Sequence, residues 1–158
     1  MSSLLTNLAA NGRRTDILER VEAPAAALTL TRAATLAIVT TGTTITWQSE
    51  VRNRGFNWSG TDITIPTGGF YVMQVSYATT GTVTMSTQIT VNGTRLGYIG
   101  FQQVATNFFQ STFLRYFATG DVIQISAFPS VNTTISVNAE GAINYSPFIS
   151  ITQITGAV

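Results

Sequence analysis

Hydrophobic and polar residues alternate with a period of two along much of the chain beyond residue 28, as they do in β-strands. The alternation is clearest in two stretches, and one face of each stretch is apolar. Those apolar positions are Tyr71, Met73, Val75 and Tyr77 in the first stretch and Ile123, Ile125 and Ala127 in the second. We expect both sets to point into a hydrophobic core.

Glycine, proline and asparagine at short intervals divide this region into about ten candidate strands, with no helix between them. Their ranges are Leu28–Thr31, Ala34–Thr40, Thr44–Ser49, Asp62–Ile65, Gly69–Ala78, Thr82–Val91, Thr94–Gln102, Phe108–Phe117, Asp121–Phe128, Thr133–Glu140 and Phe148–Ile154. The pair Asn92-Gly93 favours a tight hairpin, because both residues tolerate positive φ. The 27 threonines strengthen the preference for strands. The pattern predicts an all-β sandwich or closed barrel.

Composition argues against most enzyme chemistry. The chain has no cysteine, histidine or lysine, which removes thiol and imidazole nucleophiles, Schiff-base lysines and the usual zinc ligands. The seven carboxylates form no evident acid/base pair, and no acidic cluster could hold calcium. Asp62 and Asp121 stand beside glycine turns, where we expect each to bond local backbone amides. We therefore expect no catalytic residues, no metal and no cofactor.

Charge and hydropathy restrict the partners. Only 9% of the residues are charged and the net charge is +1, so the chain lacks the positive field that nucleic-acid binding needs. No apolar run approaches the ~18 residues of a membrane span. The first residues also lack a basic start followed by an apolar stretch. We expect no nucleic-acid partner, no membrane anchor and no export by the ordinary signal route.

Charge is concentrated near the start of the chain, where ten of the fifteen charged residues fall in positions 1–54. We interpret residues 1–27 as an N-terminal anchoring arm and residues 28–158 as the folded body. The arm could form a short broken helix that ends at Pro24. Arg13, Arg14 and Arg20 are the candidate partner-binding residues, since arginine forms bidentate pairs with carboxylates. The alternative is that these arginines are exposed and contact nothing.

Four segments resemble motifs of the tumour necrosis factor and complement globular-head superfamily. The run Gly60–Met73 resembles its strand, proline corner and Gly-hydrophobic-Tyr step. Trp47–Gly55 resembles the preceding aromatic strand and loop, Phe117–Ile123 the late Gly-Asp turn, and Ser146–Ile151 the closing strand. The four occur in the expected order over about two thirds of the chain. One departure is Ile63, where the family usually has phenylalanine.

The resemblance implies a jelly roll of about ten strands that forms a homotrimer around a three-fold axis. It further implies that the face carrying Phe70, Val72 and Gln74 approaches this axis. Independently, that face is half apolar, which suggests burial between sheets or a subunit interface. The alternative that the three side chains fill the space between the two sheets remains open at this point.

Three function classes fit these observations. The first is a virion structural protein, a phage capsid decoration (cement) trimer located on the capsid surface and held by its arm to the major capsid protein or another virion subunit. The second is the receptor-binding head of a tail fibre or spike that recognises a host-surface glycan. The third is a cellular adhesion or lectin-like trimer. Candidate sugar-stacking residues are Trp58, Tyr98, Tyr145 and Phe148, although Trp58 could instead cover an end of the sandwich.

Overall fold

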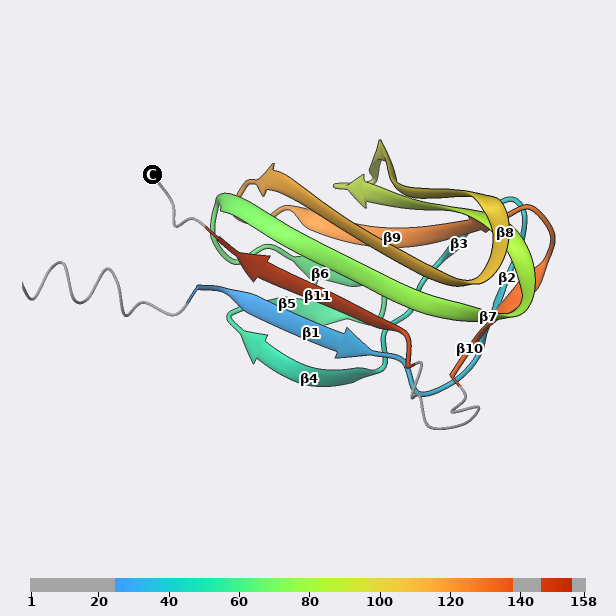
Figure 1. The fold of residues 1–158 in the computed structure, drawn as a ribbon. Helices are drawn as coiled ribbons and strands as arrows, with labels where there is room; N and C mark the ends of the chain where they lie inside the picture. The colour runs from blue at the N-terminus through green and yellow to red at the C-terminus, as the bar shows by residue number, and fades with distance from the viewer. Residues whose placement is uncertain (1–24, 138–145, 155–158) are drawn as a thin grey trace, which may run out of the picture.

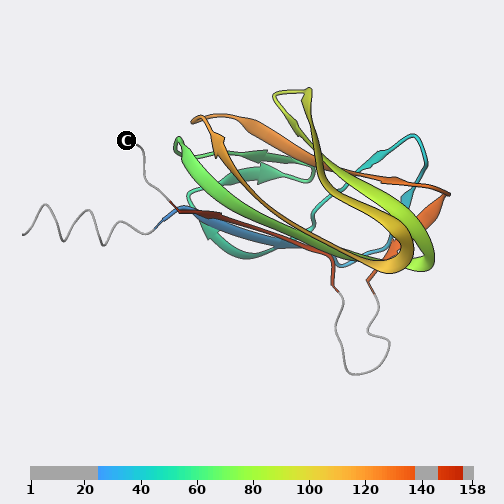
Figure 2. The ribbon, with the colours of Figure 1, turned by 45° about the horizontal axis from the view of Figure 1, so that its top comes forward.

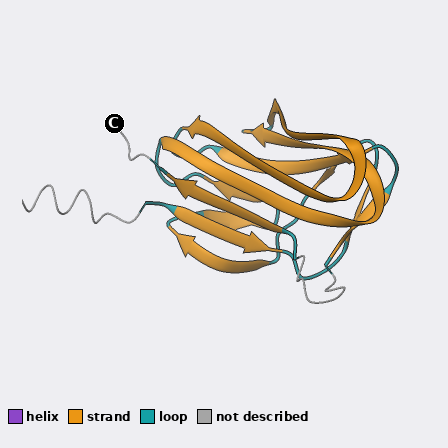
Figure 3. Ribbon diagram, viewed as in Figure 1, coloured by secondary structure: helices purple, strands orange, loops and turns teal. Residues whose placement is uncertain are grey.

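The computed structural model describes residues 25–137 and 146–154. The predicted arm residues Arg13, Arg14 and Arg20 lie outside these described residues. Within them the chain forms strands and no helix (Figure 3). The described segments accordingly contain no helix that is long and apolar enough to cross a membrane.

Eleven strands are joined in one hydrogen-bonded sheet that folds over on itself into two layers (Figures 1 and 2). Their bounds are β1 Ala27–Thr31, β2 Leu36–Ile38, β3 Thr43–Thr44, β4 Ser49–Arg54, β5 Asn57–Ser59, β6 Asp62–Thr64, β7 Gly69–Val91, β8 Thr94–Phe117, β9 Val122–Pro129, β10 Thr133–Ser136 and β11 Phe148–Gln153. The first layer runs β4, β1, β11 and the first half of β7, followed by the second half of β8. The second layer runs β5, β6, β9 and the second half of β7, followed by the first half of β8.

The strands β7 and β8 each run through both layers. The sequence predicted four strands here, Gly69–Ala78, Thr82–Val91, Thr94–Gln102 and Phe108–Phe117, and this division was wrong. The pairing between β7 and β8 continues around the bend with shifts in register between Ala78 and Met85. Within the bend Val83 still pairs with Thr106, so both strands run on through it without a reversing turn.

The predicted strand Thr44–Ser49 was also wrong, since residues 45–48 form no strand. The amides of Ile45, Trp47 and Gln48 donate to carbonyls of three different segments, so no single ladder forms. The next residues form β4, which the sequence did not predict as a strand. Five of its six side chains are exposed, and a strand without a buried face gives no alternation to detect.

The predicted core is confirmed. Tyr71, Met73, Val75 and Tyr77 are buried between the layers, as are Ile123, Ile125 and Ala127. The Tyr77 ring stacks on Phe109 with ring centres 5.5 Å apart, and its hydroxyl lies 2.5 Å from the Thr87 hydroxyl. Burial raises the pKa of Tyr77 to about 12, although the hydrogen bond with Thr87 opposes the shift.

The predicted Asn92-Gly93 hairpin is confirmed, with φ values of 51° and 76° at the two residues. Asp121 supports this end of the sandwich, as predicted, by accepting the Ala118 amide at 2.8 Å; it also accepts the Asn92 side-chain amide at 2.8 Å. Asp62 behaves differently from the prediction. It accepts side-chain groups instead of local backbone amides, because the flanking strands β6 and β9 bring Gln124 opposite it.

Candidate self-association surface

β8 is an edge strand along its whole length. Within residues 25–137 and 146–154, the one strand that pairs with β8 is β7, in both layers. An unpaired strand edge presents backbone N–H and C=O groups to any neighbour that can align with it. At 24 residues β8 is several times longer than a typical strand, so this open edge is large.

The exposed side chains of β8 include many large hydrophobic ones beside polar ones such as Gln102, Gln103 and Asn107. No charged residue occurs among the nineteen positions between Arg95 and Arg115. The exposed large hydrophobic side chains of the strand are Leu96, Tyr98, Phe101, Val104, Phe108, Leu114 and Tyr116. Scattered exposed hydrophobic residues are ordinary, but neighbouring ones such as Leu114 and Tyr116, which pair with Val72 and Phe70, are typical of an interaction surface.

The predicted interface residues Phe70, Val72 and Gln74 lie on the outer face of the first layer. They pair across the sheet with Tyr116, Leu114 and Thr112. Because Tyr71, Met73 and Val75 fill the space between the layers, the alternative that Phe70, Val72 and Gln74 do so does not apply. The structure thus turns the predicted face outward, and the role of that face in a trimer stays a prediction.

Four of these side chains form an apolar patch together with a fifth that follows β11. We call Phe70, Val72, Leu114, Tyr116 and Ile154 the outer apolar patch. Phe70, Leu114 and Tyr116 are 45%, 57% and 56% exposed, and the rings of Phe70 and Tyr116 meet edge to face with centres 5.5 Å apart. The Ile154 amide donates to the Phe70 carbonyl at 2.9 Å, which holds Ile154 beside the sheet. The sequence analysis found the β7 part of this patch and missed the β8 part.

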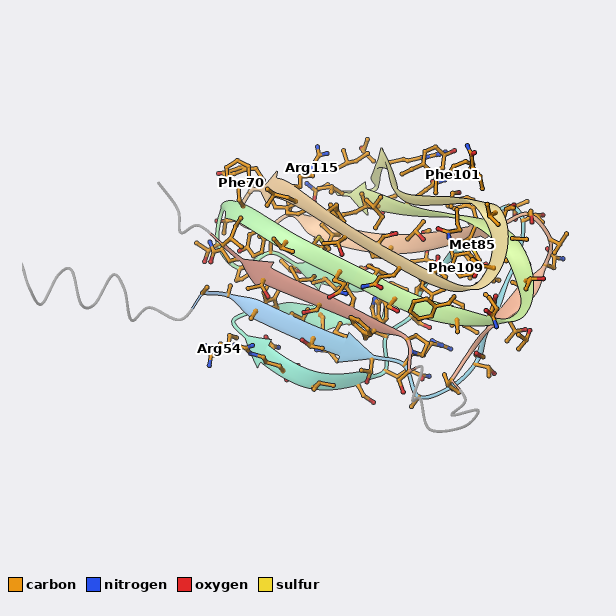
Figure 4. The ribbon with its side chains drawn as sticks, in the orientation of Figure 1. Arg54, Phe70, Met85, Phe101, Phe109 and Arg115 are labelled. Carbon is orange, nitrogen blue, oxygen red and sulfur yellow. The ribbon has the colours of Figure 1, made fainter. Side chains whose placement is uncertain are left out.

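A cavity of about 190 Å³ opens where the two halves of β8 face each other across the sandwich. Its lining side chains include Ile89, Leu96, Ile99, Phe113 and Arg115. Arg115 is the charged group here, and Figure 4 shows it at the same end of the molecule as Phe70. The cavity adjoins the outer apolar patch through Leu114, so both belong to one continuous apolar edge.

The polar and aromatic candidate residues lie apart from one another in the part of the chain that the structure describes. In residues 25–137 and 146–154, no three carboxylates lie close enough together to hold a metal ion. Of the candidate sugar-stacking residues, Tyr98 is exposed, Phe148 and Trp58 are half-buried, and Tyr145 lies outside the described residues. Trp58 packs against the core and donates its indole N–H to Glu50 Oε2 at 2.8 Å. That bond and one from Asn53 lower the pKa of Glu50.

Comparison with known proteins defines the fold. No protein-family model and no curated protein matches this sequence. Among solved structures, murine APRIL matches with a TM-score of 0.58 at 18% identity, covering 82% of this chain and 99% of that one. Eiger TNF from S. frugiperda matches with a TM-score of 0.58 at 11% identity, covering 85% and 96%. The globular domain of zebrafish complement 1qA protein matches with a TM-score of 0.54 at 13% identity, covering 84% and 99%.

These matches confirm the predicted jelly roll. At 11–18% identity they establish the arrangement of the strands and leave the partners of this chain open. A shared fold by itself does not determine function.

Proposed function

We propose that this protein is a virion structural protein, a capsid decoration trimer that stabilises a phage shell through its N-terminal arm. The observation that carries the self-association is the outer apolar patch, which lies on the first layer beside the open edge of β8. Three copies arranged around a common axis would cover these side chains in a closed assembly, which a symmetric ring contact achieves without open ends.

The trimer part of the proposal has a direct test. Analytical ultracentrifugation of the full-length protein at micromolar concentration should give the mass of three chains. Tyr98 and Tyr116 should then give different crosslinking results, because Tyr116 lies in the outer apolar patch whereas Tyr98 lies on the other half of β8. Photo-crosslinking from position 116 should join subunits. A monomer at these concentrations would contradict the proposal.

The virion part rests on the chain's chemistry. The protein has a sparsely charged body without histidine, cysteine or lysine, and its charge is concentrated at the start of the chain. A fixed shell component needs contact surfaces and no catalytic groups. Arg13, Arg14 and Arg20 would pair with carboxylates of the major capsid protein or another virion subunit.

The arm is tested by deletion. Because Ala26 and Ala27 are buried in the body, the deletion should stop at residue 24. We expect the truncated chain to remain a folded trimer and to lose binding to capsid particles in a co-sedimentation assay. Replacing Arg13, Arg14 and Arg20 by alanine should weaken the same binding, whereas replacing the exposed Arg52 and Arg54 of β4 should not. Full binding by the truncated chain would contradict the arm's role.

A second candidate function is the receptor-binding head of a tail fibre or spike. The observation that favours it is the exposed aromatic pair Tyr98 and Phe101 on the second layer, whose ring centres lie 6.1 Å apart. Antibody labelling of purified particles separates the two functions. Many labels over the shell support a decoration protein, and a few at the tail support a fibre head.

A further inference from the structure

The outer face of the second layer is a surface of a different kind. Its strands turn Ile89, Ile123 and Ile125 inward, so the side chains between them point outward. Cross-strand pairing places these outward side chains in three adjacent rows. The rows are Asp62, Gln124, Thr90 and Arg95, then Thr44, Ser126, Gln88 and Tyr98, then Phe128, Ser86 and Phe101.

The first row is a chain of hydrogen bonds. Gln124 Nε2 donates to Asp62 Oδ1 at 2.6 Å, and Thr90 Oγ1 donates to Gln124 Oε1 at 3.4 Å. The bond from Gln124, with a second from Thr61, lowers the pKa of Asp62. In the next row the hydroxyls of Thr44 and Ser126 lie 3.1 Å apart. These side chains are half-buried, so the bonds fix them in place while part of each side chain remains exposed.

Aromatic rings and Arg95 stand over the other end of this face. The Arg95 guanidinium carbon lies 4.7 Å from the centre of the Tyr98 ring and 5.9 Å from that of Phe128. Since Tyr98 belongs to β8 and Phe128 to β9, the guanidinium reaches across β7 between them. Gln88, on β7 below, is only 4% exposed. Tyr98 and Phe101 are 60% and 63% exposed, so their rings remain open to a ligand.

The loop before β3 fixes the position of Phe128. Gly42 has φ of 101°, and a Cβ atom at this position would lie 2.1 Å from the Phe128 ring. Glycine is therefore required for the loop to lie against the ring. The Phe128 ring is thus held in position by the loop on one side and by Arg95 on the other.

We propose that the Asp62, Gln124, Thr90 row and the Arg95, Tyr98 platform together bind a neutral saccharide. A sugar ring has an apolar C–H face that can stack on Tyr98, and its hydroxyls both donate and accept hydrogen bonds, as the row requires. With a strand spacing of about 4.8 Å, β6 and β8 lie about 14 Å apart, which suits a short oligosaccharide.

The chemistry of the face argues against other occupants. An apolar protein surface would cover the polar row and leave its remaining groups without partners. Nucleic acid needs several cations, and Arg95 is opposed by Asp62 at the other end of the same row. Because these two charges are opposite, the row favours a ligand without net charge. A neutral saccharide matches both properties.

This site does not depend on the proposed virion role, and it deepens the second candidate function, the receptor-binding head, which rests on the same exposed Tyr98. Tyr98 also lines the cavity that adjoins the outer apolar patch through Leu114. The saccharide site lies on the outer face of the second layer, whereas the outer apolar patch lies on the first layer. A trimer built on the patch would carry one such platform on each subunit. The two proposals can therefore fail separately.

The test uses fluorescently labelled full-length protein on an array of oligosaccharides. The array holds neutral chains of glucose, galactose and mannose beside sialylated and uronate-containing chains. We expect binding to at least one neutral chain. Tyr98→Ala and Gln124→Ala should each weaken that binding at least ten-fold, and Tyr98→Phe should retain most of it because the ring remains. Val131→Ala, at an exposed hydrophobic position in the loop before β10, should leave binding unchanged.

Three results would overturn the proposal: no binding to any neutral chain, binding confined to acidic chains, or unchanged affinity in both Tyr98→Ala and Gln124→Ala. Thermal unfolding of each variant shows whether it is folded, and Gln124→Ala tests the site even if one aromatic variant is unstable. Sedimentation of the same samples reports self-association. If the protein is a trimer that binds no neutral saccharide, only the proposed saccharide site is wrong. If it is a monomer that binds one, only the proposed trimer is wrong.

Discussion

The two edge strands of the first layer differ in length and in charge. One edge is β4, which has six residues and carries Glu50, Arg52 and Arg54. Its pairing with β1 shifts register between Thr29 and Leu30. The other edge is β8, which has 24 residues and no charge between Arg95 and Arg115. Figure 1 shows the two strands on opposite sides of the sandwich.

This difference indicates which edge is protected from pairing with another chain and which is open to it. Short length, charged side chains and irregular pairing all prevent one strand edge from joining another chain, and β4 has all three. β8 is long and carries no charge between Arg95 and Arg115, although its pairing with β7 also shifts register. Since the same chain protects one edge and leaves the other apolar, the openness of β8 is a local property of that strand.

The largest expected effect tests the two faces of β8 itself. Phe109 is 4% exposed and stacks on Tyr77, whereas Phe101 on the same strand points into solvent. We expect Phe109→Ala to lower the free energy of unfolding by about 3–5 kcal/mol, because it removes a buried ring and leaves a cavity. Phe101→Ala should change it by roughly 0.5 kcal/mol or less. Denaturant titration measures both, and equal effects would show that β8 has no distinct inner face.

A charge on each edge compares the edges directly. Leu114→Glu places a carboxylate in the outer apolar patch, and burying it without a partner should weaken self-association on the order of 10³-fold, about 4 kcal/mol. Val51→Glu is the matched change on β4, where Val51 is 67% exposed. It should leave association unchanged. Sedimentation over a concentration series measures both variants, and a Leu114→Glu protein that associates normally would remove β8 from the interface.

Alkaline pH should weaken the β8 side. The pKa of Tyr77 is raised from 10.0 to about 12 by burial, so its contribution to stability is complete below pH 10 and is lost as the pH rises towards 12. Two pKa units correspond to roughly 2–3 kcal/mol. Tyr77→Phe should reduce this loss, although it also removes the bond to Thr87. Unfolding at pH 8 to 12 measures the slope, which should be the same in both proteins if Tyr77 does not titrate.

Acid should act weakly on the β4 side. The hydrogen bonds from Trp58 and Asn53 lower the pKa of Glu50 below 4.5, so its small contribution is present above that pH and is lost as the pH falls through the lowered value. Because Glu50 is exposed, we expect a slight effect. Glu50→Gln should flatten the acid limb of stability between pH 5 and 2. An identical acid limb in the variant would show that the β4 edge has no role in acid sensitivity.

The alternation of apolar and polar residues predicted the core correctly in strands that have one buried face and one exposed face. Tyr71 and Ile123 were placed correctly in the core because their strands alternate between apolar and polar residues. The same signal fails along β4, where nearly every side chain is exposed, and along β8, where large hydrophobic residues occur at both exposed and buried positions. Phe113 and Leu114 are both hydrophobic, and only the fold shows that Phe113 packs against the core whereas Leu114 is exposed.

The candidate sites were harder to predict than the fold. Phe70 and Val72 could be chosen because a half-apolar second face is visible within one strand. The saccharide platform could not, since Asp62, Gln124 and Arg95 are far apart in sequence and come into one row through three cross-strand registers. Register depends on long-range packing, which local patterns do not encode.

The pairing of β1 with β11 determines how this head would respond to force. Ala27, at the start of β1, lies opposite Thr152, near the end of β11. A pull that separates the two ends of the body would therefore peel these strands apart one hydrogen bond at a time. Strands pulled along their length would instead have to break several bonds together. The head should be mechanically weak between its own ends, and it would resist load better if it were held by one end alone.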